Sequence, residues 1–273
     1  MRNVYLGLPA YNEELAVDPL FKRIRAARAS LMTTGLASEL FVIVYDDGST
    51  DNTANEVREH AEGLEVLLLS PKSNGGLGVA LRGLINEFLD QADTDDVLVI
   101  MDADDTHDPR QIVELLSAID GKAKDVVIAS RYRKRARILG VPKYRQILSL
   151  GFGVLMRLVL PIQGVRDYSC GYRAYTYESL SKLTTDQGFP IQESGFASMP
   201  EVLIRLRSHQ LNFGEIPLVL SYDRRLTVSK MQAWHNSWRL INRIFDWRLF
   251  PSHLQSKPTN VPDQRVWWEV ETL

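Results

Sequence analysis

The chain has 273 residues, of which 45% are hydrophobic and 24% are charged, and its formal net charge at pH 7 is −2. This composition is that of a globular protein with one large domain or two small ones. The near-neutral charge argues against a nucleic-acid-binding protein held by phosphate contacts. A single cysteine, Cys170, excludes a disulfide framework and a multi-cysteine metal site, and it suits a reducing, cytoplasmic compartment.

No segment has the pattern of a signal peptide or of a membrane-spanning helix. The first residues carry a charge and reach Pro9 after only a few apolar positions. The most apolar stretch, residues 146–161, contains Arg157, and it is shorter than the roughly 20 residues that cross a bilayer. We therefore expect no transmembrane segment, while a segment lying on a membrane surface stays open.

Apolar and β-branched runs alternate with helical patterns in the first half of the chain. The runs predict buried strands at residues 4–8, 40–45, 64–69, 97–101 and 126–129. The segments between them predict helices at residues 13–31, 52–60, 79–89 and 113–119. This alternation predicts an α/β fold with a mostly parallel sheet flanked by helices, in which ligands bind beyond the carboxyl ends of the strands.

A polar motif follows each of the first four predicted strands. The motifs are Pro9-Ala10-Tyr11-Asn12-Glu13, Asp46-Asp47-Gly48-Ser49-Thr50-Asp51, Asn74-Gly75-Gly76-Leu77-Gly78 and Asp102-Ala103-Asp104. Each motif alone has a plain structural interpretation, as a strand-to-helix connection or a helix cap. Four of them after four successive strands are much more specific than any one, and they predict a binding site at this edge of the sheet.

The pair Asp102 and Asp104 lies where a predicted buried strand breaks into a loop. Two carboxylates at this spacing repel each other when they turn toward one point, and a divalent cation removes that repulsion. Oxygen ligands that leave water positions free suit Mg²⁺ or Mn²⁺ bridging the phosphates of a substrate. On its own, the motif is more often a capped turn that leads into the helix after Pro109.

Motifs of several other enzyme classes are absent. Gly76 and Gly78 lack the third glycine of a dinucleotide-binding loop, and the sequence has no Walker-type phosphate loop. It also has no G-x-S-x-G turn, and its five histidines do not have the H-E-x-x-H spacing. These absences disfavour a Walker-type ATPase, a hydrolase and a zinc enzyme. Because no base is identifiable beside Cys170, we expect it to be a packing residue rather than a nucleophile.

Taken together, the four motifs resemble those of the inverting family-two glycosyltransferases, which have the GT-A fold. Within that family the chain resembles dolichyl- and polyprenyl-phosphate sugar synthases. The supporting residues are His107, Ser130-Arg131-Tyr132, Asp167-x-Ser169-x-Gly171-Tyr172-Arg173-Ala174, Asp223-Arg224 and Ser229-Lys230. The resemblance implies a GT-A catalytic domain over residues 1–230, followed by an amphipathic helix and an extension over residues 231–273.

The resemblance implies metal-dependent, inverting transfer of a hexose from a GDP- or UDP-linked sugar to a polyprenyl phosphate. Asp46 or Asp47 would hold the base and ribose of the donor. Asp102 and Asp104 would position Mg²⁺ or Mn²⁺ on the diphosphate. The other implied nucleotide-sugar contacts are Pro9, Tyr11, Asn12, Glu13, Gly76 and Ala103.

The resemblance also implies which residues contact the phosphates. Arg224 and Lys230 would lie over the donor phosphates or the acceptor phosphate, where cations stabilise developing charge. Arg131, Ser169 and Arg173 would bind the acceptor phosphate. The implied catalytic residues are Asp104, Arg131, Arg224 and Lys230.

A phosphate acceptor is already a nucleophile at neutral pH, whereas a hydroxyl acceptor needs a general base, for which Glu201 or Asp167 is the first candidate. The chain departs from the usual pattern at Thr106, where related synthases carry a Gln. Thr106 is accordingly the third implied metal contact, although a hydroxyl reaches less far than an amide. The loop between Arg224 and Lys230 also lacks the glycine that is often found there.

Two segments bear on membrane binding. Residues 131–145 hold seven Lys and Arg residues and no acid, and they lead into the apolar residues 147–160. This pattern suits an anionic lipid surface, and a solvated loop before a core helix explains it equally well. A second segment, residues 231–245, places four large apolar side chains on one helical face, for packing or for a membrane interface. They are Trp234, Trp238, Ile241 and Phe245.

Three functions stay open at this point. The chain is a glycosyltransferase that uses a lipid phosphate, peripheral on the cytoplasmic membrane face, or a family-two enzyme that acts on a small hydroxyl acceptor. The third alternative is a non-catalytic sugar-nucleotide-binding protein. The Trp267-Trp268 pair would serve packing or a contact in a homo-oligomer.

Overall fold

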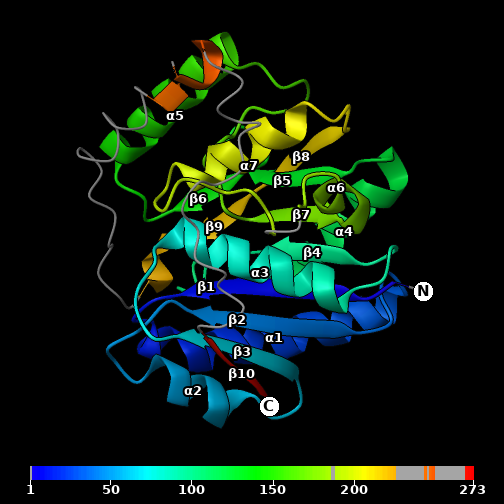
Figure 1. Ribbon diagram of the computed structural model, residues 1–273, viewed down its shortest axis with the longest axis vertical. Helices are drawn as coiled ribbons and strands as arrows, with labels where there is room; N and C mark the ends of the chain where they lie inside the picture. The colour runs from blue at the N-terminus through cyan, green and yellow to red at the C-terminus, as the bar shows by residue number, and fades with distance from the viewer. Residues whose placement is uncertain (1, 186–187, 226–242, 245, 250–267) are drawn as a thin grey trace.

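The computed structural model describes residues 2–185, 188–225, 243–244, 246–249 and 268–273. Within these residues the chain forms an eight-stranded sheet with the order β10-β3-β2-β1-β4-β7-β5-β8 (Figure 1). Its strands are β1 (Val4–Ala10), β2 (Leu40–Asp46), β3 (Glu65–Pro71), β4 (Val97–Ile100), β5 (Val126–Ser130), β7 (Arg173–Thr176), β8 (Phe213–Pro217) and β10 (Trp268–Thr272). A separate parallel pair joins β6 (Arg137–Leu139) to β9 (Val219–Ser221).

The five strands predicted from apolar runs are β1 to β5, and the α/β fold with a mostly parallel sheet is confirmed. β1 and β2 are longer than predicted because their parallel pairing continues through Pro9 with Tyr45 and Ala10 with Asp46. This extension places Asp46 at the end of the sheet rather than in the following loop.

The strand directions bring the ends of the predicted strands to one edge. β1 pairs in parallel with β2 and β4, and β2 pairs in parallel with β3. β7 is antiparallel to both β4 and β5, so β5 runs in the same direction as β4. The chain moves outward from β1 to β3 and then returns to β4 on the other side of β1. In open α/β sheets such a reversal marks the crevice in which ligands bind.

Helices cover both faces of the sheet (Figure 1). The helix α1 packs against α2, α4 and the short η1 on one side, and α3 packs against α6 and α7 on the other. Their bounds are α1 (Glu14–Thr34), α2 (Thr53–His60), α3 (Leu77–Gln91), η1 (Pro109–Gln111), α4 (Ile112–Lys122), α6 (Tyr177–Ser181) and α7 (Ser198–Arg207). As predicted, Asp108 accepts a hydrogen bond from Arg110 N–H at the start of η1.

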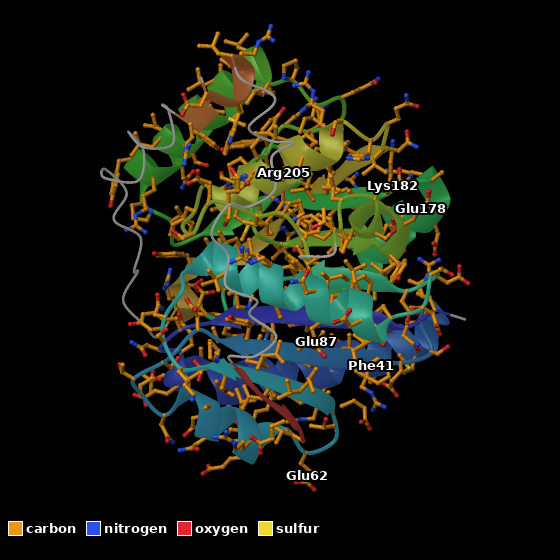
Figure 2. All side chains as sticks on the ribbon, in the orientation of Figure 1. Phe41, Glu62, Glu87, Glu178, Lys182 and Arg205 are labelled. Carbon is orange, nitrogen blue, oxygen red and sulfur yellow. The ribbon has the colours of Figure 1, made fainter. Side chains whose placement is uncertain are left out.

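The core lies between these layers. Val4, Leu6 and Leu8 on β1 are buried, and Tyr5 stacks on Phe41 of β2 with 5.0 Å between ring centroids; Phe41 is labelled in Figure 2. α3 approaches the sheet closely because it carries Gly83, where an added Cβ would lie 2.3 Å from the Tyr45 ring. The sheet is therefore apolar on both faces, which explains the continuous apolar runs of its strands.

α5 (Lys143–Val159) differs from the other helices. It lies at one end of the molecule, beyond the covered sheet (Figure 1). Only Gly153 and Met156 of this helix are buried. A set of large apolar side chains stays exposed on it: Tyr144, Ile147, Leu148, Leu150, Val154 and Leu158. No helix among the described residues is both long and apolar enough to cross a bilayer.

Several predictions concern residues outside the described ones. These include the domain boundary between residues 230 and 231, Lys230 itself, Trp267 and most of the predicted helix at residues 231–245. From that helix the structure describes residues 243–244, of which Ile244 is buried in the core. The backbone of Trp268 starts β10, which pairs antiparallel with β3.

Candidate active site

The loops after β1 and β2 are held together by side-chain to backbone hydrogen bonds. Asn12 has a φ of +52°, its N–H donates to Ser49 Oγ at 2.8 Å, and its Oδ1 accepts from Thr50 N–H at 2.7 Å. The buried Glu13 donates its N–H to Thr53 Oγ1 at 2.8 Å. These contacts fix the first two predicted motifs, which include Pro9 at the end of β1 and Tyr11 beside it, in one arrangement.

Asp46 and Asp47 have different roles in this arrangement. Asp47 accepts the N–H groups of Gly75 and Gly76, one on each carboxylate oxygen, both at 2.8 Å. Burial raises the pKa of Asp47, and the two glycine N–H groups oppose that shift. Asp46 uses Oδ1 to accept Ser49 N–H at 3.1 Å. Asp47 therefore shapes the glycine loop, which makes Asp46 the better-placed carboxylate for a ligand.

The glycine loop packs against the loop at residues 193–194. Gly78 donates its N–H to Ser194 O at 2.8 Å, and an added Cβ at Gly78 would lie 1.7 Å from Glu193 O. At Gly76, which has a φ of +86°, an added Cβ would lie 2.5 Å from Ser194 O. The motif therefore needs glycine because another loop packs directly against it.

Glu201 of α7 holds that second loop. Its carboxylate accepts the N–H groups of Gln192 at 3.0 Å and Glu193 at 2.9 Å, and it pairs with Arg205 at 2.7 Å. Arg205 is labelled on α7 in Figure 2. Glu201 is 1% exposed. Since its oxygens are engaged and buried, Glu201 does not suit the role of general base that the sequence left open for it.

Asp102 and Asp104 lie where β4 ends, at the reversal of strand order. Asp104 is buried, and its Oδ1 accepts Thr106 Oγ1–H at 2.6 Å and Thr106 N–H at 3.2 Å. Its Oδ2 lies 3.3 Å from a guanidinium nitrogen of Arg225. The Asp102 side chain is 44% exposed, and its Oδ2 lies 3.8 Å from Nδ1 of the buried His107. Asp102 is thus partly exposed, whereas Asp104 is buried and held by Thr106. Ala103 between them is buried.

These residues supply part of the coordination of a divalent cation, and water or a ligand must complete it. Asp102 and Asp104 Oδ2 offer two hard oxygen atoms, and no group of three His, Cys, Asp or Glu side chains suited to a metal occurs in the part of the chain that the structure describes. Mg²⁺ is commonly held by one or two carboxylates plus water and substrate phosphates. Thr106 donates its hydroxyl to Asp104, so it supports that carboxylate, and we do not propose it as a third ligand.

Arg131, directly after β5, forms an ion pair with the buried Asp167, in the segment that precedes β7. Asp167 is 0% exposed and accepts Arg131 Nε–H at 2.8 Å and Nη2–H at 2.6 Å. Burial acts to raise the pKa of Asp167, but the Arg131 guanidinium outweighs it and holds that pKa below its ordinary value. Arg131 also donates to Ser169 Oγ at 2.7 Å. Arg131 and Ser169 are thus together, and Asp167 is bound in an ion pair rather than poised as a base.

Two other predicted residues lie in the core. Arg173 is 0% exposed, and its guanidinium donates to Tyr168 O at 2.8 Å and to Met199 O at 2.7 Å. It therefore ties β7 to α7 instead of reaching a phosphate, and we do not carry it forward as an acceptor contact. Cys170 is buried, and burial raises the pKa of its thiol to about 12, which agrees with the predicted packing role.

The basic segment after β9 holds two neighbouring arginines with different surroundings. Arg224 is exposed in η2 (Tyr222–Arg224), whereas the next residue, Arg225, reaches Asp104. Tyr222 connects this loop to α5, because Arg145 donates to Tyr222 Oη at 2.9 Å. Arg225 was not predicted from the sequence. It directly follows Arg224 in a motif already assigned to phosphates, and this doubling of arginine was the available signal.

Arg23 of α1 is another residue that the sequence analysis missed. It forms an ion pair with Asp105, which has a φ of +59°, and it donates to His107 O at 2.9 Å. These contacts fix the turn that follows Asp104. A single arginine within a helix pattern gives no local signal of such a role.

Comparison with known proteins agrees with this geometry. The family model described as Glycosyl transferase family 2 matches residues 5–184. A polyprenol monophosphomannose synthase of Mycolicibacterium smegmatis is 28% identical over 88% of this chain and 84% of its own length. A dolichol-phosphate mannosyltransferase of Pyrococcus furiosus is 32% identical over 72% of this chain, which spans about half of that relative.

Solved structures share the fold. The glucosyl-3-phosphoglycerate synthase of Mycobacterium tuberculosis, crystallised with Mn²⁺, uridine diphosphate and phosphoglyceric acid, superposes with a TM-score of 0.61 at 18% identity. That match covers 100% of this chain and 87% of the other. The same enzyme with Mg²⁺ and uridine diphosphate gives a TM-score of 0.60 at 19% identity. The fold is that of the GT-A glycosyltransferases.

Proposed function

The chain belongs to glycosyl transferase family 2 and is a glycosyltransferase, and we propose that it transfers a hexose from a nucleoside diphosphate sugar to a polyprenyl phosphate. The observation that carries this proposal is that Arg225 contacts Asp104 in a segment that Arg145 joins to α5 through Tyr222. The site of the two aspartates therefore adjoins a helix with exposed apolar side chains. The relatives named for polyprenol and dolichol phosphates support the same acceptor.

The donor side of the proposal uses the interlocked loops of β1 and β2. Asp46 would bind the base or ribose of a GDP- or UDP-linked sugar, within the pocket shaped by Asn12 and the glycine loop. Mg²⁺ or Mn²⁺, held by Asp102 and Asp104 with the diphosphate, would neutralise charge on the departing nucleotide. A single displacement at the sugar carbon would invert its configuration through an oxocarbenium-like state.

The acceptor side favours a phosphate over a hydroxyl. Both carboxylates considered as general bases are engaged and buried, Asp167 with Arg131 and Glu201 with Arg205. A phosphate acceptor needs no base because it is already ionised at neutral pH. Arg131 and Ser169 would contact that phosphate, and Arg224 and Lys230 remain proposed contacts from the following loop.

α5 supports a membrane-bound acceptor. Ile147, Leu150, Val154 and Leu158 recur at helical spacing and are all exposed, and the basic residues of the segment 131–145 precede and enter the helix. Apolar side chains beside cations suit the interface of an anionic bilayer. We therefore propose that the protein lies on the cytoplasmic face of a membrane through α5.

The proposal is tested by incubating the full chain with radiolabelled GDP- and UDP-hexoses, Mg²⁺ or Mn²⁺, and polyprenyl phosphate in anionic vesicles. We expect label from one donor to enter the organic phase, and Asp104→Asn to abolish most of that transfer. Label that stays water-soluble with every donor, or that enters a hydroxyl acceptor instead, would overturn the lipid-phosphate acceptor.

A further inference from the structure

Arg225 occupies a position that a cation at Asp104 would need. One of its guanidinium nitrogens lies 3.3 Å from Asp104 Oδ2, and its side chain is 16% exposed. The other carboxylate oxygen, Oδ1, is already taken by the N–H and the hydroxyl of Thr106. Asp104 therefore has one oxygen to offer, and Arg225 contacts it.

Arg225 also has capacity for a second partner. Its Nε is buried and has no hydrogen-bond partner among the described residues. The guanidinium lies over the Tyr222 ring, 5.5 Å from its centroid, which holds the side chain in place without using that donor. A buried donor without a partner is unfavourable, so the arrangement favours the arrival of an acceptor. A planar guanidinium with a free N–H is well suited to phosphate oxygens.

We propose that Arg225 is an exchangeable counter-ion: it neutralises Asp104 when no cation is bound there, and it transfers to the donor diphosphate when a divalent cation takes its place at Asp104. The inference rests on the proposed nucleotide-sugar donor. It assigns Arg225 a role beyond those of Arg224 and Lys230, and it makes the cation and Arg225 competitors for one oxygen atom.

The competition is tested by measuring the affinity for Mn²⁺ without nucleotide, with electron paramagnetic resonance at pH 7.5 as the readout. Arg225→Gln removes the competitor, so we expect it to bind Mn²⁺ about fivefold more tightly, the factor that corresponds to one partly exposed ion pair. Arg224→Gln is the matched control, because it removes the same charge from the adjacent exposed position. Unchanged or weaker Mn²⁺ binding by Arg225→Gln, or an equal gain in Arg224→Gln, would overturn the exchange.

The second half of the exchange is measured by calorimetry with GDP and UDP in the presence of saturating Mn²⁺, which holds Asp104 and leaves Arg225 available to the diphosphate. We expect Arg225→Gln to bind the preferred diphosphate about fivefold more weakly than the parent chain, and Arg225→Lys, which keeps the charge, to lie between them. Circular dichroism checks that each variant is folded, and the Lys variant carries the test if the Gln variant is not. An Arg225→Lys variant that binds diphosphate as weakly as a folded Gln variant would contradict a counter-ion role.

Neither measurement uses sugar transfer, so the inference and the proposed function can fail separately. The expected changes in Mn²⁺ and diphosphate affinity, without any lipid product, would support the exchange and contradict the proposed lipid-phosphate acceptor. Lipid product without the Mn²⁺ shift would support the acceptor and overturn the exchange.

Discussion

The two halves of the sheet differ in how far the polar and apolar groups around them are paired or covered. The first half-sheet comprises β1, β2 and β3 with the loops 9–14, 46–53 and 74–78, and these loops are joined to one another by direct hydrogen bonds. The second half-sheet comprises β5, β7 and β8 with the segments 130–145 and 167–172 and α5. There a buried ion pair lies near an exposed apolar helix and exposed arginines.

The difference shows what each half-sheet is prepared to bind. Loops that are already ordered lose little conformational entropy when a small soluble ligand binds, which suits a nucleotide. An exposed apolar helix gains stability only when a partner removes it from water. Among the described residues, the loops of the first half-sheet are thus paired with one another, whereas α5 in the second leaves apolar side chains exposed, and β4 presents Asp102 and Asp104 between the two.

The largest effect is expected from Asp167→Asn, which breaks the ion pair that stabilises the second half-sheet. Leaving Arg131 without its carboxylate should lower the free energy of unfolding by about 3 kcal/mol, measured by urea denaturation at pH 7. Because the folded pKa of Asp167 is lowered, its contribution is fully present above its unfolded pKa of about 3.9. That contribution is lost as pH falls through the folded pKa.

The pH dependence is the control for this prediction. The difference in stability between the parent chain and Asp167→Asn should be largest near neutral pH and should shrink below about pH 4. An equal difference at pH 3 and pH 7 would show that packing, rather than the charge of Asp167, is what the substitution removes.

The next effect is expected at the strand between the two half-sheets. Asp104→Asn removes the charge that faces Arg225 but keeps an oxygen for Thr106, so the fold should persist while sugar transfer falls about 100-fold. Initial rates with the preferred donor measure the change, and a melting curve confirms the fold. Transfer within a factor of three of the parent rate would remove Asp104 from the proposed site.

A smaller effect is expected on vesicle binding, and it should differ between the surfaces of the two half-sheets. Leu158→Glu replaces an exposed side chain of α5, and we expect it to weaken binding to anionic vesicles about tenfold, since one apolar side chain no longer enters the interface. Leu15→Glu makes the same change on α1, beside the first half-sheet, where Leu15 is 57% exposed. Co-sedimentation should distinguish the two variants, and equal losses would contradict docking through α5.

The smallest effect concerns the support of Asp104. Thr106→Val keeps the shape but loses the hydroxyl donor at 2.6 Å, so we expect about a fivefold fall in kcat at nearly unchanged KM for the acceptor. Thr106→Ser retains the donor and should restore the rate. A Ser variant as slow as the Val variant would show that the methyl group, not the hydrogen bond, positions the carboxylate.

The sequence predicted those parts of the fold that depend on local patterns. Buried strands have continuous apolar runs, so β1 to β5 were found, and parallel α/β connections place the carboxyl ends of strands at one edge, so the four motifs were expected together. β7 between β4 and β5 was not predicted, because its antiparallel pairing joins residues far apart in the chain. β10 was missed for the same reason.

Within the site, residue types were easier to predict than partners. The sequence placed Arg131 near Ser169, and the structure joins them. It could not show that Arg173 is buried and bonded to backbone carbonyls, or that Asp47 is committed to two glycine N–H groups. Arg225 differs from Arg224 by one position in the chain, and only the path of the backbone decides which guanidinium reaches Asp104.

β10 has a consequence for how the first half-sheet meets its surroundings. It covers the outer side of β3 with antiparallel backbone pairing, and Glu271 joins it to Arg58 of α2 at 2.8 Å. An uncovered outer strand offers a row of free N–H and C=O groups to which a strand from another molecule can add, and a charged residue on the outermost strand discourages that addition. The late segment of the chain therefore takes the edge position from β3 and places a charged residue there.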